Sequence, residues 1–195
     1  MRPTEERDGA GQDAWFRELW KTHYDAVLGY VARQSDLETA RDVMNDAFVV
    51  VWRKPGKVPA EPDGVRPWLY RVAQRQLANR RRSRQRAENL TARLGGALGI
   101  APHGGNPEDA VVEMAPVVQA LNRLSRRDQE ILRLIGWEEL NLAEAAMVLH
   151  CSPAAAATRL HRARRRLERV LEEIDHSGAA VNTTGASATV VEEKR

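Results

Sequence analysis

Two arginine-rich stretches with helical periodicity dominate this sequence, one at residues 68–86 and the other at residues 152–171. Each stretch ends a separate run of helical segments, and a Gly-rich segment, GGALGIAPHGGNP, lies between the two runs. Apolar residues recur every three or four positions in both runs, and no stretch alternates as a β-strand would. We therefore predict an all-α protein with two small helical domains joined by a flexible linker, the C-terminal one a helix-turn-helix.

The predicted boundaries follow changes in composition along the chain. We expect a disordered N-terminus at 1–13, a first domain at 14–86, a linker at 87–115, a second domain at 116–175 and a disordered tail at 176–195. In the first domain, the loop 54–66 precedes a helix that should start near Pro67, a favoured first-turn residue. The clearest inner stripe belongs to the helix before this loop: Ala40, Val43, Met44, Ala47, Phe48, Val51 and Trp52.

Capping residues define the helices of the second domain. Ser125 with Asp128, and Asn141 with Glu144, resemble N-caps followed by an acid three residues later. Ser152 and Pro153 should open the last helix as N-cap and first-turn proline. The predicted inner side of that helix is Ala156, Leu160, Ala163, Leu167, Leu171 and Ile174.

Composition excludes several classes of protein. The single cysteine, Cys151, forbids an internal disulfide, and the polar N-terminus and short apolar runs predict a cytoplasmic protein. His150, Cys151 and His161 lack the usual spacing of metal ligands. We find no catalytic residues, no metal ligands and no sign of a cofactor or small-molecule substrate. The net charge is only +3, so the clustered arginines point to a directed anionic partner.

Three helix faces are candidate binding surfaces. The outer side of the last helix carries small residues first and cations later: Ala154, Thr158, His161, Arg162, Arg165 and Arg169. A recognition helix enters the major groove in this way, with its N-terminal residues near base edges and its arginines near phosphates. From these residues alone, a solvated charged face is the alternative.

The helix 68–86 presents a mixture of cations, amides and one ring opposite its apolar side: Tyr70, Arg71, Gln74, Arg75, Ala78, Asn79 and Arg82. Such a surface suits a nucleic-acid strand, because aromatic rings can stack on unpaired bases. Whether Tyr70 stacks on a base or belongs to the core stays open at this point.

The helix 38–53 has an acidic outer side: Glu38, Asp42, Asn45, Asp46, Val49 and Arg53. An acidic surface around an apolar Val49 would suit a basic, helical protein partner. An ordinary solvated face with one exposed valine is the alternative.

Taken in order, five segments resemble the extracytoplasmic-function sigma factors of bacterial RNA polymerase, in the sigma-70 family. They are FRELWKTHYDAVLGYVAR, ARDVMNDAFVVVWRK, RPWLYRVAQRQLANRRR, LNRLSRRDQEILRL and LAEAAMVLHCSPAAAATRLHRARRRL. The resemblance covers about residues 14–86 and 116–172. It implies an alternative sigma factor, without enzymatic activity, that binds core polymerase, reads promoter elements and aids promoter melting.

The resemblance also implies partners and residue roles. The docking residues Asp42, Asn45, Asp46 and Val49 would bind the β′ clamp helices of the polymerase. The β subunit would be a further polymerase contact. The minus-ten promoter element would be held by Tyr70, Arg71, Gln74, Arg75, Asn79 and Arg82. The minus-thirty-five element would be read by Ser152, Ala154, Ala155, Thr158, Arg159, His161, Arg162 and Arg165. An anti-sigma factor is a further expected partner.

The sequence departs from the family pattern in two regions. Residues 154–157 are all alanine where relatives often have a Gly-Thr-Val-Lys type of run, and Glu139 stands where glycine is common.

Two alternative functions are weighed against the sigma factor. One is a stand-alone helix-turn-helix regulator that binds duplex DNA as a dimer, and the other is an enzyme that uses the His and Cys positions.

Overall fold

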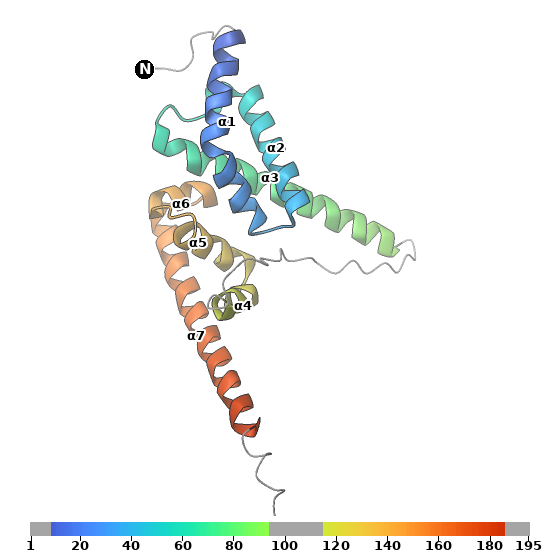
Figure 1. Ribbon diagram of the computed structural model, residues 1–195, viewed down its shortest axis with the longest axis vertical. Helices are drawn as coiled ribbons and strands as arrows, with labels where there is room; N and C mark the ends of the chain where they lie inside the picture. The colour runs from blue at the N-terminus through green and yellow to red at the C-terminus, as the bar shows by residue number, and fades with distance from the viewer. Residues whose placement is uncertain (1–8, 94–114, 186–195) are drawn as a thin grey trace, which may run out of the picture. The chain divides into compact units, whose positions relative to one another are not determined.

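The computed structural model describes residues 9–93 and 115–185. Within these residues the chain forms seven α-helices, one 3-10 turn and no strand (Figure 1), which confirms the predicted all-α class. The chain divides into two compact units, one built on α1, α2 and α3 and the other on α4, α5 and α7. None of the described helices is both long and apolar enough to span a bilayer.

The first unit is a three-helix bundle. It contains α1 (Gly9–Ala32), α2 (Leu37–Arg53) and α3 (Pro62–Arg93), and each helix contacts the other two. A short 3-10 turn, η1 (Pro55–Lys57), follows α2. The largest fully buried side chains of this unit are Tyr30, Tyr70, Phe48, Met44, Leu69, Leu77, Val27, Val31, Val43 and Val51. Burial of these apolar side chains is the main stabilising term of the bundle.

α2 has the inner side that its periodicity predicts, with one exception. All the predicted residues from Ala40 to Val51 are buried, but Trp52 is 41% exposed. Trp52 lies in the last turn of α2, and the ring of Phe16 of α1 meets its ring edge-on, with centroids 5.2 Å apart. The helix starts at an Asp36 N-cap, whose carboxylate accepts a bond from the Thr39 amide at 2.8 Å.

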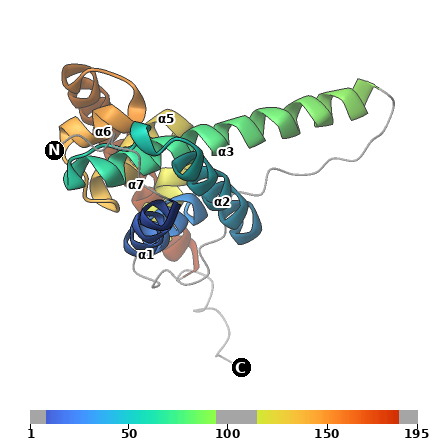
Figure 2. The same ribbon diagram turned by 90° about the horizontal axis from the view of Figure 1, so that it is seen from above.

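α3 is longer than predicted at both ends. It begins with Pro62 rather than near Pro67, which lies inside the helix. Pro62 satisfies the first-turn preference, and the buried pair Val65 and Leu69, one turn apart, favours helix through this segment. The helix then continues to Arg93, into the range expected to be linker, and its C-terminal half extends past α1 and α2 (Figure 2). Residues 94–114, which include the Gly-rich segment, lie outside the described residues.

The second unit contains α4 (Ala115–Arg123), α5 (Arg126–Gly136) and α7 (Pro153–Gly185), with α6 (Leu142–Leu149) between α5 and α7 in the sequence. α7 contacts both α4 and α5. Two predicted N-caps are confirmed: the Ser125 hydroxyl accepts a bond from the Asp128 amide, and the Ser152 hydroxyl accepts one from the Ala155 amide, both at 3.2 Å.

Two ends predicted to be disordered are partly helical. α1 starts at Gly9, inside the predicted N-terminal range, and α7 continues to Gly185, ten residues into the predicted tail (176–185). For α7, the predicted stripe continues to its last members, since Leu171 and Ile174 are partly buried. Residues 1–8 and 186–195 lie outside the described residues.

The turns on either side of α6 each need a left-handed residue. Glu139, between α5 and α6, has a φ of 53°, and His150, directly after α6, has a φ of 55°. Glycine adopts this region without steric cost, whereas other residues adopt it with strain. The backbone at position 139 therefore suits glycine better than the glutamate that stands there.

Candidate nucleic-acid and protein interfaces

The outer side of α2 combines acids with exposed apolar surface. Asn45 is exposed, and Val49 is 46% exposed. The side chains of Asp42 and Asp46 are 53% and 48% exposed. Together these four residues, which we call the α2 docking face, form one continuous strip, because positions three and four apart are neighbours on a helix.

Both acids of the α2 docking face already have a partner inside the unit. Arg80 of α3 donates from Nη1 to Asp42 Oδ2 at 2.9 Å and from Nη2 to Asp46 Oδ2 at 2.7 Å. Its Nε adds a bond to the same Asp46 oxygen at 3.2 Å. Arg80 is absent from every predicted set, since nothing local in the sequence links position 80 to α2.

Tyr70 does not belong to the outer side of α3, so its predicted role as a strand contact is wrong. It is only 1% exposed, and its ring stacks on that of Tyr30 with centroids 4.5 Å apart. Leu69, Ala73 and Leu77 are buried with it, so the inner side of α3 is wider than the sequence suggested. A fully buried ring has no face left for a base.

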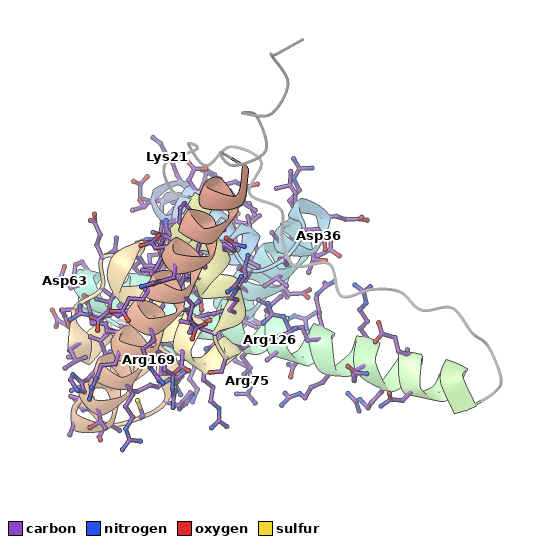
Figure 3. The ribbon with its side chains drawn as sticks, turned by 90° about the horizontal axis from the view of Figure 1, so that it is seen from below. Lys21, Asp36, Asp63, Arg75, Arg126 and Arg169 are labelled. Atoms are coloured by element: carbon purple, nitrogen blue, oxygen red, sulfur yellow. The ribbon has the colours of Figure 1, made fainter. Side chains whose placement is uncertain are left out.

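The remaining residues of the predicted strand-binding set lie on the outer side of α3. Arg75, Asn79 and Arg82 are exposed, and Arg71 and Gln74 are half-buried. Figure 3 labels Arg75 on this helix. Arg82 donates to the Asn79 side-chain oxygen at 2.6 Å, which orders the end of the surface. Arg81, by contrast, donates to the backbone oxygen of Gln34, near the C-terminal end of α1.

The outer side of α7 agrees with the sequence prediction in nearly every position. Its exposed residues are Ser152, Ala154, Ala155, Thr158, His161, Arg162 and Arg165. Arg169, labelled in Figure 3, is exposed further along the same helix. Ala156 and Ala163 are fully buried beneath this surface. The first turns are therefore small and the later turns cationic.

Two arginines of α7 face α5 instead of the outer side. Arg159, predicted to contact DNA, is half-buried and donates from Nε to the backbone oxygen of Arg127 at 3.1 Å. Arg166 donates to Asp128 Oδ2 at 2.7 Å, and the side chain of Asp128 is only 6% exposed. The Ser125 hydroxyl donates to the same carboxylate oxygen. These bonds fix how α7 is rotated against α5.

An aromatic cluster flanks the C-terminal end of α2. Phe16, Trp20 and Trp52 line a shallow pocket of about 260 Å³ together with Asp13 and Arg17. Of these rings, Trp52 belongs to the inner stripe predicted from the periodicity of α2. Among the described residues, no group of three or more His, Cys, Asp or Glu side chains is placed to hold a metal ion.

Two family models match the chain, one in each half. Sigma-70 region 2 matches residues 19–87, which include α2 and the whole arginine-rich stretch of α3. Sigma-70 region 4 matches residues 114–167, which run from α4 into α7. The region 2 match lies within the unit of α1, α2 and α3, and the region 4 match takes in α4, α5, α6 and the first half of α7.

Full-length relatives extend this result. The RNA polymerase sigma factor NccH of Alcaligenes xylosoxydans is 30% identical over 178 residues, covering 85% of this chain and 91% of the relative. The ECF RNA polymerase sigma factor BldN of Streptomyces coelicolor is 30% identical over 173 residues, covering 86% of this chain and 64% of BldN. The chain belongs to the extracytoplasmic-function sigma factors. Proteins of this family direct RNA polymerase to promoters. The alternative function, a stand-alone helix-turn-helix regulator, is therefore not favoured.

A solved structure agrees with the fold of this sigma factor. The sigma factor RpoE of Bartonella quintana, crystallised with the anti-sigma factor NepR, superposes with a TM-score of 0.62 at 22% identity. The match covers 80% of this chain and 96% of RpoE. At this identity the likeness concerns the fold.

Proposed function

We propose that this sigma factor docks on core RNA polymerase through the α2 docking face and holds promoter DNA through the outer sides of α3 and α7. The first unit would serve polymerase docking and the minus-ten element, and the second unit the minus-thirty-five element. The observation that carries the proposal is that these exposed surfaces, one acidic and two cationic, occupy separate helices of two compact units. The proposed function involves no catalytic step.

The α2 docking face would meet the β′ clamp helices. Val49 supplies exposed apolar area at the centre of the strip, and Asp42, Asn45 and Asp46 supply polar oxygens around it. An apolar centre with a polar rim is the usual anatomy of a protein interface. The β subunit remains a further proposed contact of the polymerase.

The minus-ten surface consists of Arg71, Gln74, Arg75, Asn79 and Arg82, without Tyr70. Cations on the backbone and amides on base edges would hold the unpaired non-template strand. Binding the open strand better than the duplex shifts the equilibrium toward the melted state. Melting therefore requires no covalent chemistry from this protein.

The minus-thirty-five surface is the outer side of α7. The small exposed residues Ala154, Ala155 and Thr158 would permit close approach to base edges, and the exposed Arg162 and Arg165 in the following turns would hold phosphates. Ser152 and His161 complete the exposed set. We assign Arg159 to holding α7 on α5, because its guanidinium already bonds to Arg127.

We further propose an anti-sigma protein as a restraining partner. RpoE, whose fold this chain shares, is crystallised with such a protein, NepR. We also propose that the protein works in the cytoplasm, where core polymerase and promoter DNA are found.

Run-off transcription with purified core polymerase tests the proposed function. The sigma factor should confer initiation at discrete start sites on genomic templates, which core polymerase alone does not give. A dimeric regulator would instead shift duplex DNA by itself and add no start site. Absence of specific initiation with any promoter enriched from genomic fragments would reject the proposal.

The docking face is tested by the double variant Asp42→Asn with Asp46→Asn. Charge reversal is a poor test, because two lysines would sit against Arg80 and destabilise the contact of α2 with α3. Asparagine keeps an oxygen that can accept from Arg80 but removes both charges. We expect polymerase affinity to fall by about tenfold with little change in Tm; unchanged capture of core polymerase would mean that the docking face is wrong.

A further inference from the structure

We propose that Arg80 is a positioning residue for polymerase docking: it bridges Asp42 and Asp46, holds both carboxylates in the orientation that core polymerase meets, and makes no promoter contact. This inference rests on the proposed function of the α2 docking face.

The bridge leaves one oxygen of each carboxylate available. All three bonds from the Arg80 guanidinium end on Oδ2 atoms, one on Asp42 and two on Asp46. Within residues 9–93 and 115–185, no other bond reaches the two Oδ1 atoms. Arg80 therefore uses one edge of each carboxylate, and the other edge can accept a bond from a partner.

The position of Arg80 on α3 separates it from the proposed DNA surface. Arg71 and Arg80 are nine positions apart, which is about two and a half helical turns and places them on opposite sides of the helix. Arg80 instead follows Leu77 and Ala73 on the buried side, the side that contacts α2. A cation that faces α2 cannot reach a strand bound at Arg71 and Arg75.

Charge gives the bridge a second effect. Asp42 and Asp46 lie one turn apart on α2, where two like charges repel each other. Arg80 offsets this repulsion and leaves a net charge of −1 on the three groups rather than −2 on two. The bonds to Asp46 are the largest cause of the raised pKa of Arg80, so it stays charged at any working pH. The three side chains are 40%, 53% and 48% exposed, which leaves them within reach of a partner protein.

These two effects act on different rate constants. Without Arg80 the docking face carries a larger negative charge, so association with a basic partner should become faster and more dependent on salt. The carboxylates would also lose their fixed orientation and would have to be ordered on binding, which should speed dissociation. The faster dissociation is the diagnostic effect, because a cation beside the docking face changes association through its charge alone, whereas a residue that only stabilised the fold would leave dissociation unchanged.

The experiment compares Arg80→Met with Arg81→Met in the full chain, by binding kinetics on immobilised core polymerase at several salt concentrations. Arg81 is the matched control, because it also joins α3 to another part of the unit, but to the Gln34 backbone oxygen in the turn after α1. For Arg80→Met we expect dissociation about tenfold faster and association about twofold faster with a steeper salt dependence. Arg81→Met should bind as the wild type, and Tm is measured for both.

Arg80→Lys refines the result, because lysine keeps the charge but cannot bridge two carboxylates in a planar geometry. It should restore the wild-type association rate and leave dissociation fast. Wild-type dissociation of Arg80→Met, or equal losses in Arg80→Met and Arg81→Met, would overturn the proposal. If Asp42→Asn with Asp46→Asn binds polymerase normally, the docking face itself is wrong; if that variant is weak and Arg80→Met is normal, only the role of Arg80 fails.

Discussion

The two arginine-rich helices use their cations in the same way but rest on different inner surfaces. α3 is held by large buried side chains, Leu69, Tyr70 and Leu77, whereas the fully buried residues of α7 are the alanines Ala156 and Ala163. On both helices, the arginines near the inner side bond to their own unit and the outer ones remain exposed. The number of arginines in a stretch therefore overstates its DNA-binding surface, and the rotation of the helix decides which of them belong to it.

The largest expected effect concerns the inner side of α3. Tyr70→Ala removes a buried ring that stacks on Tyr30, so the first unit should lose about 3–5 kcal/mol of unfolding free energy. Tyr70→Phe keeps the ring and should lose less than about 1.5 kcal/mol. Urea unfolding of the full chain measures both. If Tyr70→Ala loses little unfolding free energy and binds a minus-ten strand more weakly, Tyr70 contacts DNA and is not a core residue.

The second prediction separates inner from outer arginines on α7. Arg162→Ala with Arg165→Ala should lower the steepness of the salt dependence of duplex binding by about 1.8, or 0.9 for each lost phosphate contact. Arg166→Ala should leave that slope unchanged and destabilise the second unit, because it removes the partner of Asp128. Fluorescence anisotropy across a salt series, with thermal unfolding, gives both quantities. Equal slopes in all variants would contradict the division.

The third prediction compares the N-cap of α2 with that of α7. Asp36→Ala and Ser152→Ala should each cost about 1 kcal/mol at neutral pH. The bond from the Thr39 amide lowers the pKa of Asp36 below 3.8, so its contribution is present above that pH and is lost as pH falls through the lower folded value. The hydroxyl cap does not titrate. The unfolding free energy of each variant is compared with that of the wild type at pH 7 and in the acid range. The difference should disappear in acid for Asp36→Ala and persist for Ser152→Ala.

The smallest expected effect concerns the turn between α5 and α6. Glu139→Gly should stabilise the second unit by about 0.5–1 kcal/mol, because glycine adopts a φ of 53° without strain. His150→Gly, at a φ of 55°, should act in the same direction. A lower Tm in Glu139→Gly would show that the side chain at 139 contributes more than the backbone strain costs.

Local signals predicted the helices and most of their starts correctly. The stripe of α2, the Ser125 and Ser152 caps and the exposed side of α7 all follow from spacing and residue type within one segment. Helix ends were less predictable, because α3 and α7 continue beyond the ranges where the composition turns polar or small. The side chains from Ser83 to Leu90 of α3 are mostly exposed, so no change in packing marks where that helix ends.

The sequence by itself determined the helical class, the two helical parts and most of the exposed side of α7, since apolar spacing and capping residues act within a few residues of each other. Only the tertiary structure decided that Tyr70 is core and that Arg80 and Arg166 serve α2 and α5. Arg80 and its partners are 34 and 38 residues apart, and Arg166 is 38 residues from Asp128. Bonds over such separations depend on how each helix is rotated against the next, and no periodicity within one helix encodes that rotation.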